Sequence, residues 1–188
     1  DQIIRNIAGT NTYIDGFYMA AAASGYLSAT QNVAIPLTNK TLSGFSILRD
    51  RKYKKTILNE LGSVGATVLE PVIGGGKVLA GRTTSQSGFI EDEEISIMFI
   101  RDRVKEVLRS SVKGFIGGLN DENTRGLVIS KVISTMSSLV SQGLISGYRN
   151  VRVEQDKIDP RQINVYLQYA PVYPLNFIFI DLEVTSSI

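Results

Sequence analysis

The clearest pattern of apolar and polar positions lies in residues 121–142. Apolar side chains recur there at a spacing of three or four and form one stripe: Val128, Val132, Met136, Leu139 and Val140. Asn120 or Asp121 can cap the start of such a helix, and Gly143 stands where a left-handed C-terminal cap would be needed. The pattern therefore predicts an amphipathic helix over this range.

A second long helix is predicted over residues 91–117. It opens with four consecutive acids, which the helix dipole favours in a first turn. Apolar residues at helical spacing follow, and Gly117 and Gly118 are expected to end it. We interpret the acids as a solvated helix start, because contiguous carboxylates point around the axis and do not converge on one cation.

The first third of the chain has weaker helical patterns. Residues 13–29 contain an alanine-rich run that Asp15 can cap. A short helix is predicted over 52–61, where three apolar residues share one face: Tyr53, Ile57 and Leu61. Turn-forming residues dominate 30–47, for which we predict mostly loop.

A hairpin is predicted next to these helices. Residues 66–73 and 77–82 are rich in strand-forming residues and are separated by Gly74, Gly75 and Gly76. Pro71 indicates that the first strand lies at an edge or carries a bulge. Residues 74–77 invite comparison with a phosphate-binding loop, but Pro71 stands where the first glycine is needed and Val78 follows the lysine, so the hairpin turn is favoured.

The last third of the chain is predicted to be β-structure. Strands are expected over 148–153, over 163–169 and over 177–184. Alternation in the second of these places four residues on its buried face: Ile163, Val165, Leu167 and Tyr169. The fold class is therefore α+β, with two long helices packed on a mixed or antiparallel sheet.

Composition narrows the possible chemistry. The 188 residues suit one domain, or one domain with an arm, and 43% hydrophobic residues argue against disorder. Without His or Cys the chain lacks the usual general base, thiol nucleophiles and common metal ligands, so we expect no catalytic, cofactor or metal site. A net charge of +2 is too small for an electrostatic nucleic-acid binder, and no apolar run is long enough to span a membrane. Because the chain begins at Asp1, we expect a fragment or trimmed form.

Two charged or apolar segments remain as candidate contact surfaces. The basic run 49–55 contains one aromatic residue, so a solvated helix face is favoured over nucleic-acid binding, with protein contacts a third option. The strand at 177–184 is long and carries no Lys or Arg to protect its edge. From the residues alone, an internal sheet strand and a strand added to another copy of the chain are about equally favoured.

The order and spacing of several short motifs resemble the C-terminal half of contractile tail sheath proteins of bacteriophages and related injection machines. The resemblance covers roughly residues 20–184. The motifs are IPLTNKTLSGF (35–45), LGSVGATVL (61–69), GGKVLAGRTT (75–84), GFIG (114–117), VSQGLISGY (140–148), DPR (159–161) and APVYPLNFI (170–178). Members of this family carry further N-terminal sequence, including an extended arm, which this chain lacks.

The resemblance implies a structural subunit of a helical or stacked-ring sheath. Such a sheath surrounds the tail tube and contracts to drive it through the host envelope during genome delivery, releasing stored free energy without nucleotide. The subunit would be a core domain over residues 1–175 with a C-terminal arm over 176–188. Its expected partners are other copies of itself, the tail tube protein, and baseplate and tail-terminator proteins, in a virion tail assembled in the host cytoplasm.

The resemblance also implies two sets of contact residues. The residues expected to add a strand to a neighbour are Phe177, Ile178, Phe179, Ile180, Leu182 and Val184, with the strands at 148–153 and 163–169 as acceptors. The candidate charge contacts with the tube or a neighbouring subunit are Glu91, Asp92, Glu93, Glu94, Arg101, Arg103, Lys105, Arg109 and Lys113. The alternatives are another virion tail component, in the baseplate or terminator, and less favourably a nucleotide-binding α+β enzyme domain.

Overall fold

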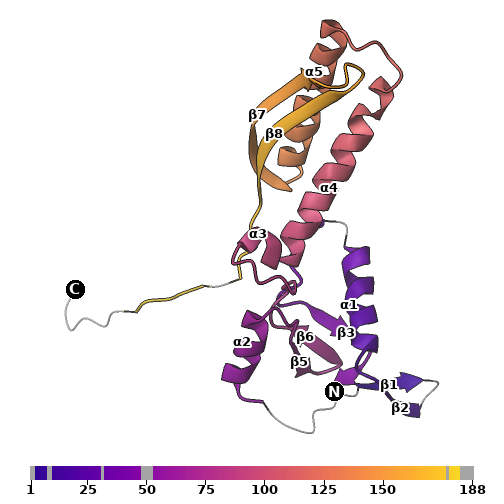
Figure 1. Ribbon diagram of the computed structural model, residues 1–188. Coiled ribbons are helices and arrows are strands. Elements are labelled where there is room, and N and C mark those ends of the chain that lie inside the picture. The colour runs from indigo at the N-terminus through magenta and orange to yellow at the C-terminus, as the bar shows by residue number, and fades with distance from the viewer. Residues whose placement is uncertain (1–2, 8–9, 31, 48–52, 177, 183–188) are drawn as a thin grey trace.

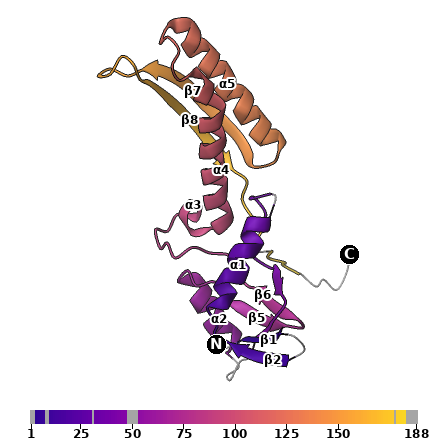
Figure 2. The ribbon, with the colours of Figure 1, turned by 90° about the vertical axis from the view of Figure 1, so that its right-hand side faces the viewer.

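Helix α4 (Ile95–Val112) connects the two parts of an elongated molecule (Figures 1 and 2). The computed structural model describes residues 3–7, 10–30, 32–47, 53–176 and 178–182. One part is built around α4 and the elements that follow it, and the other is built from the elements that precede it. Helices and strands occur in both parts, and every strand pair among the described residues is antiparallel, which confirms the α+β class.

The first part, which we call the hairpin lobe, packs two helices with a long two-stranded sheet. Its elements are α4, the 3₁₀ turn η1 (Lys113–Phe115), α5 (Glu122–Ser141), β7 (Ile145–Gln155) and β8 (Ile163–Pro171). Its buried core consists of Ile100, Val104, Val128, Val132, Met136, Leu139, Leu144 and Ile145. Helices α4 and α5 thus bury one stripe each against the same hairpin.

Helix α5 is formed as its sequence pattern predicts. The Asp121 side chain accepts a hydrogen bond from the Thr124 N–H at 2.7 Å, and this bond lowers the pKa of the Asp121 carboxyl. Gly143 adopts a left-handed φ of 70°, which lets the Leu144 N–H bond the Leu139 carbonyl at 3.1 Å. Four of the five predicted stripe residues are buried, whereas Val140 is 37% exposed.

The strands predicted at 148–153 and 163–169 lie within β7 and β8. Ile163, Leu167 and Tyr169 pack on the core as alternation predicts, but Val165 is exposed. The register shifts between Arg149 and Arg152, where Asn150 takes a φ of 56°. Such a bulge bends the strand and increases its twist.

The second part, which we call the small-sheet lobe, contains two three-stranded sheets in the orders β2-β1-β4 and β3-β6-β5. Its elements are β1 (Ile3–Ile7), β2 (Thr10–Ile14), α1 (Tyr18–Ala29), β3 (Thr41–Ser43), β4 (Ser46–Ile47), α2 (Lys55–Ser63), β5 (Leu69–Val72) and β6 (Gly75–Val78). Leu37, Leu42, Phe45 and Val78 form its buried core, against which one face of α1 packs.

Two predictions for residues 10–47 are wrong in part. The helix predicted over 13–29 begins only at Tyr18, because residues 10–14 pair with β1 instead. Asp15 makes no side-chain cap, and Phe17 occupies the cap position. The predicted loop 30–47 contains β3 and β4, which form only because distant strands supply their hydrogen-bond partners.

The predicted apolar face of α2 is also wrong. Tyr53, Ile57 and Leu61 are all exposed, and Lys52, where the prediction began, lies outside the described residues. Leu58 and Gly62 form the buried side. A Cβ on Gly62 would lie 3.8 Å from Ala80 Cβ, an ordinary van der Waals contact, so this side of the helix faces the segment that contains Ala80.

The predicted hairpin is confirmed, but its turn is shifted. Val72 pairs with Gly75, which leaves Ile73 and Gly74 as the turn, with Gly74 at a φ of 78°. Gly75 lies in the central strand, where a Cβ would come within 2.0 Å of the Leu42 carbonyl oxygen. Pro71 lies on the edge strand as expected. Because no helix follows β6 directly, these glycines do not form a phosphate-binding loop.

The predicted helix over 91–117 is interrupted. Residues Ile90–Glu93 form the single turn α3, and Glu94 is extended at φ −95° and ψ 124° before α4 begins. Glu94 forms a bridge with Arg82, flanked by bonds from the Thr83 N–H to the Glu93 carbonyl and from the Ile95 N–H to the Gly81 carbonyl. Pairing with a distant segment therefore overrides the local helical pattern at this residue.

No helix in the described part of the chain is both long and apolar enough to cross a bilayer.

Two neighbouring residues of α5 provide a test of this packing. Leu139 is 1% exposed and Val140 is 37% exposed. We expect Leu139→Ala to lower the free energy of unfolding by about 2–5 kcal/mol, because it removes buried methyl groups and leaves a cavity, and Val140→Ala by about 1 kcal/mol or less. Urea denaturation of both variants measures the difference, and equal losses would contradict the assigned helix face.

Candidate intersubunit surface

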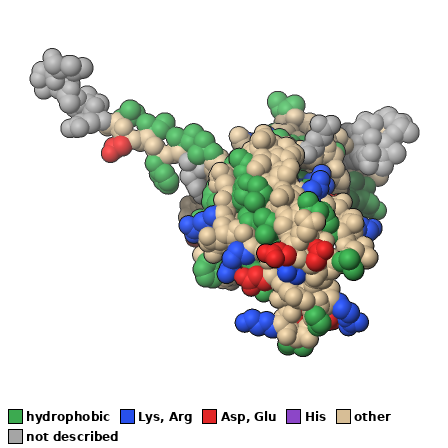
Figure 3. Space-filling model, turned by 90° about the horizontal axis from the view of Figure 1, so that it is seen from above, with side chains coloured by type: hydrophobic (Ala, Val, Ile, Leu, Met, Phe, Trp, Pro, Cys, Tyr) green, Lys and Arg blue, Asp and Glu red, His purple; other side chains and the backbone are tan. Residues whose placement is uncertain are grey.

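The C-terminal segment 178–182 extends away from the rest of the molecule (Figures 1 and 3). It has no strand partner, and Phe179 is 95% exposed. Ile178, Ile180 and Leu182 are exposed as well, so four large apolar side chains face solvent in five residues. Phe177 and Val184, the other two predicted strand-addition residues, lie outside the described residues. An exposed apolar segment of this kind is typical of a protein–protein contact.

The preceding residues 172–176, which we call the strap, lie on the body of the protein. The Val172 N–H donates to the Leu144 carbonyl at 3.3 Å. The Tyr173 hydroxyl donates to Glu91 Oε1 at 2.8 Å, and Asn176 Nδ2 donates to Glu94 Oε1 at 2.6 Å. The strap therefore fixes the point at which the C-terminal segment leaves the protein.

The four predicted acidic contact residues surround the strap and are engaged within the chain. Glu91 and Glu94 bind it directly, Asp92 pairs with Arg101 at 3.2 Å, and Glu93 approaches Arg82 at 3.6 Å. Glu94 is only 6% exposed, so the interpretation of all four as a solvated helix start is wrong for this residue.

The pKa shifts of these acids follow their surroundings. The hydrogen bond from Tyr173 lowers the pKa of the exposed Glu91 carboxyl and raises that of the Tyr173 hydroxyl. Burial raises the pKa of the Glu94 carboxyl, against the opposing effects of the Arg82 charge and the Asn176 hydrogen bond.

The five predicted basic contact residues are distributed along α4 and the start of η1. Arg101 is paired with Asp92, while Arg103 and Lys105 form exposed pairs with Glu106 at 2.8 Å and Asp102 at 3.6 Å. Arg109 and Lys113 are exposed near the other end of the helix. At 1.5 Å per helical residue, Arg101 and Lys113 are about 18 Å apart, so the nine charged residues do not form one compact patch.

A groove of about 1030 Å³ runs between α4 and β8. Val104, Leu108, Val165 and Leu167 contribute apolar surface to it, and Arg101, Lys105 and Arg152 contribute positive charge. The Arg152 guanidinium lies 5.7 Å from the centre of the Tyr166 ring. Beside the groove is the edge of β8 that does not pair with β7, since the sheet has only these two strands among the described residues.

The strands at 148–153 and 163–169 were both predicted as acceptors from the resemblance, and the groove beside β8 was not predicted. Arg101 and Lys105 were selected by charge, at a spacing of four that places them on one face of α4. Arg152 was not selected, because its position opposite these residues depends on the packing of β7 and β8 beside the helix.

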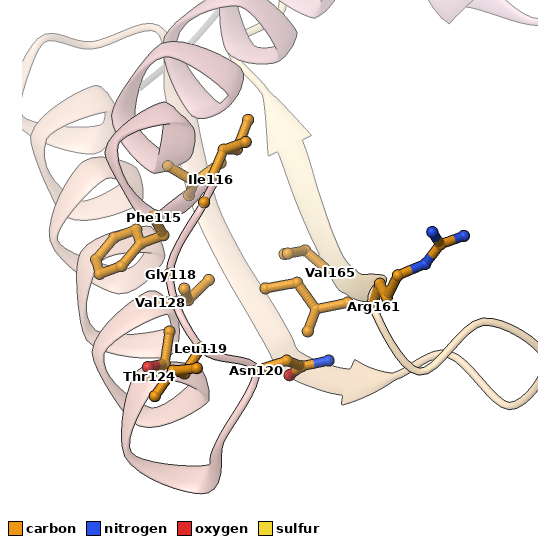
Figure 4. Close-up of a pocket in the computed structure, with 12 residues that line it drawn as sticks. Phe115, Ile116, Gly118, Leu119, Asn120, Thr124, Val128, Arg161 and Val165 are labelled. Atoms are coloured by element: carbon orange, nitrogen blue, oxygen red, sulfur yellow. The ribbon is translucent and has the colours of Figure 1, made fainter.

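A smaller apolar pocket of about 340 Å³ lies at the far end of the hairpin lobe (Figure 4). Phe115 at the end of η1, Ile116 and Leu119 of the loop before α5, and Val165 of β8 line it. Arg161 is its one charged lining residue and is bound by Asp159 through two hydrogen bonds of 3.0 Å. With no carboxylate in its lining, the pocket lacks a pair of groups for general acid–base chemistry.

The described residues contain no cluster of three or more Asp or Glu side chains positioned to hold a metal ion. The groove and the exposed segment are therefore the features that most favour a function, and both favour binding to a protein.

Comparison with known proteins agrees with this assessment. Residues 93–185 match the family described as phage tail sheath C-terminal domain. The tail sheath protein of Mycobacterium phage Bxz1 is 28% identical over 182 residues, which cover 91% of this chain and 29% of that protein. The resemblance to contractile tail sheath proteins stated from the sequence is thereby confirmed.

Solved structures agree with the fold. A chain of the anti-feeding prophage (AFP) helical sheath in the contracted state matches with a TM-score of 0.76 and 20% identity, over 99% of this chain and 54% of that one. A chain of the PVC sheath complex, an extracellular contractile injection system in the contracted state, matches with a TM-score of 0.74 and 16% identity. The match covers 98% of this chain and 55% of that one. A chain of the AFP baseplate matches with a TM-score of 0.77 and 18% identity, over 98% of this chain and 53% of that one. The chain thus spans about half the length of these structures and 29% of the phage protein.

The exposure of segment 178–182 leads to a test. Brief digestion of the isolated chain with chymotrypsin is expected to cut first after Phe179 or Leu182, because an extended, unpaired backbone fits a protease better than a packed one. Mass spectrometry of the products identifies the cleavage sites. First cleavage within α4 or α5 would contradict this order of exposure, and the buried Phe45 serves as the internal control.

Proposed function

We propose that this chain is part of a structural, non-catalytic subunit of a contractile tail sheath, and that its C-terminal segment adds a strand to a neighbouring copy. The observation that carries the first statement is the match of residues 93–185 to the phage tail sheath C-terminal domain. The match to contracted sheath chains over nearly the whole of this chain supports it independently. The exposed segment 178–182 supports the second statement.

The donated strand has two different sides. In an extended strand, Ile178, Ile180 and Leu182 share one side, while Phe179 and Asp181 share the other. The aliphatic side needs an apolar surface, and the backbone needs a partner strand with free hydrogen-bonding groups. The strap is bound to the body just before the exposed segment begins. This anchoring supports residues 1–175 as a core domain and 176–188 as an arm.

We assign the groove between α4 and β8 as the acceptor. The unpaired edge of β8 supplies backbone partners, and Leu108, Val165 and Leu167 supply apolar surface. Arg101, Lys105 and Arg152 line the groove, and each is paired with a carboxylate of its own chain: Asp92, Asp102 and Glu154. Asp181 of the donated strand would compete with these carboxylates for the three cations. A segment that leaves its own body at the strap and enters the groove of the next copy forms a head-to-tail contact, which generates open helical assemblies.

The remaining partners follow from a place in such a sheath. Copies of this chain would surround the tail tube, with the exposed cations Arg103, Arg109 and Lys113 available to the tube or to a neighbour. Baseplate and terminator proteins would bind the two ends of the sheath. The chain would then be a component of the virion tail, assembled in the host cytoplasm, and contraction would release free energy stored in a metastable lattice.

One observation favours a second place in the same machine. The chain of the AFP baseplate structure matches with a TM-score of 0.77, so a baseplate component is the alternative. Electron microscopy of the full-length protein, alone and with its tube protein, separates the two. Hollow cylinders support a sheath, whereas rings that do not lengthen in the presence of tube protein would overturn that proposal in favour of the baseplate.

The donor side of the contact can be tested by a pair of variants. Ile180→Asp in the full-length protein should reduce the yield of pelletable cylinders strongly, since it forfeits about 1.5–3 kcal/mol of apolar burial and buries a charge at each contact. Asp181→Asn, one residue away, keeps the aliphatic side and should assemble far better. Equal yields from the two variants would contradict the assigned orientation of the strand.

The acceptor side can be tested by reversing charges. Arg152→Glu should raise the critical concentration for assembly about tenfold, which corresponds to about 1.4 kcal/mol, close to the lower end of the range measured for close charge pairs at interfaces. Combining it with Asp181→Arg should restore most of the loss, while Arg103→Glu combined with Asp181→Arg should not. Assembly yields by sedimentation give the comparison, and the absence of selective rescue would place the donated strand elsewhere.

A further inference from the structure

The junction between the strap and α4 contains an unusual concentration of unsatisfied polar atoms. Among the described residues, four buried side-chain atoms have no hydrogen-bond partner: Glu94 Oε2, Ser96 Oγ, Arg101 Nε and Asn176 Oδ1. Three of them belong to the break before α4 and its first two turns, and the fourth belongs to the strap. Because buried polar groups are normally paired, their gathering at one junction calls for a physical explanation.

Two of these atoms are complementary. Asn176 Nδ2 donates to Glu94 Oε1 at 2.6 Å, which leaves the second oxygen of each group, Glu94 Oε2 and Asn176 Oδ1, without a partner. A carboxylate cannot donate to an amide oxygen, but a protonated carboxyl can. With a proton on Oε2, a carboxylic acid and a primary amide can form two hydrogen bonds at once, one in each direction.

The surroundings of Glu94 decide how easily it holds that proton. Glu94 and Asn176 line a pocket of about 330 Å³ together with Arg82, Ile90, Glu93 and the strap residues Tyr173, Pro174 and Leu175. Arg82 and the hydrogen bond from Asn176 favour the ionised form of Glu94, whereas burial and the neighbouring Glu93 favour the protonated form. Burial is the largest of these effects and raises the pKa of the Glu94 carboxyl.

We propose that Glu94 and Asn176 form a proton-controlled latch that holds the strap on the body and thereby sets the direction of the C-terminal segment. In the closed latch, Glu94 Oε2 donates to Asn176 Oδ1 while Glu94 Oε1 accepts from Asn176 Nδ2. Loss of the proton to solvent leaves two acceptor oxygens in the buried pair, and the strap is released. The latch is a property of the isolated chain, so its test does not depend on the proposed sheath function.

The direction of the pH dependence follows from the raised pKa of Glu94 in the closed latch. The closed form binds the proton more tightly than the open form, in which Glu94 has an ordinary pKa of about 4.3. The stabilisation of the closed latch by the proton is therefore fully present below that ordinary pKa, and it is lost as the pH rises through the raised pKa. The ratio of closed to open latch falls about tenfold for each unit by which closure raises the pKa.

The second contact of the strap responds in the opposite direction. Glu91 accepts from Tyr173 as a carboxylate, and this bond lowers the pKa of Glu91, so it is lost as the pH falls through that lowered value. Glu91 is exposed, and its contribution to holding the strap is correspondingly small. Tyr173→Phe removes the Glu91 contact and leaves the Glu94 pair, which makes it the matched control.

The absence of cysteine permits a direct measurement. Leu175→Cys in the full chain provides a single site for a spin label within the strap, beside Asn176, and electron paramagnetic resonance reports the mobile fraction of the label from pH 4 to pH 8. We expect this fraction to rise with pH. Tyr173→Phe should retain the rise, whereas Glu94→Gln should stay immobile throughout, because a glutamine amide donates to Asn176 Oδ1 at every pH.

Each outcome bears on the latch. A rise with pH that disappears in Glu94→Gln supports it. Mobility that does not change with pH in the parent chain overturns it, and so does a rise that persists in Glu94→Gln. A rise that disappears in Tyr173→Phe but persists in Glu94→Gln would assign the response to Glu91 and overturn the role of Glu94. Thermal unfolding of the variants at pH 6 checks that each is folded.

Discussion

The structure depends on one helix that takes part in two hydrophobic cores. Ile95 of α4 packs against the core of the small-sheet lobe, while Ile100 and Val104 are buried in the core of the hairpin lobe. Both contacts require α4 to start at residue 95 and to point away from the small sheets. The extended conformation of Glu94 and its backbone pairing beside Arg82 provide this start, so the interruption of the helix is a condition of the whole architecture.

The same helix positions every feature to which we assign a function. Its first turns, with α3, support the strap, and its middle forms one wall of the groove beside β8. A change in how the strap is held therefore occurs on the element that also shapes the acceptor. The unsatisfied polar atoms at this junction indicate a contact that is less completely bonded than either core, which suits a segment that must reach another molecule.

The parts of the fold that could be predicted are those fixed by short-range patterns. Helix α5 and the strands β7 and β8 have strong periodicity and local caps, and their predicted positions agree with the structure. The strands β3 and β4 were missed because short strands gain their stability from distant partners. The exposed side of α2 and the break at Glu94 were missed for the same reason: a tertiary contact outweighs the local pattern. In the candidate site, composition identified the apolar terminal segment and the charged residues. The engagement of Glu91 and Glu94 could not be predicted, because it depends on a strap 82 residues further along the chain.

The single open edge of β8 has a consequence for the size of any assembly built from it. Under the proposed strand addition, each chain offers one donor segment and one acceptor edge, so the two are equal in number. Every interior copy then has both satisfied, while the last copy at one end keeps an empty acceptor and the copy at the other end keeps a free donor. Where the rotation between neighbours does not close a ring, such a polymer has polarity and cannot stop its own growth. Its length must be set from outside, by whatever first occupies the acceptor at one end and covers the donor at the other.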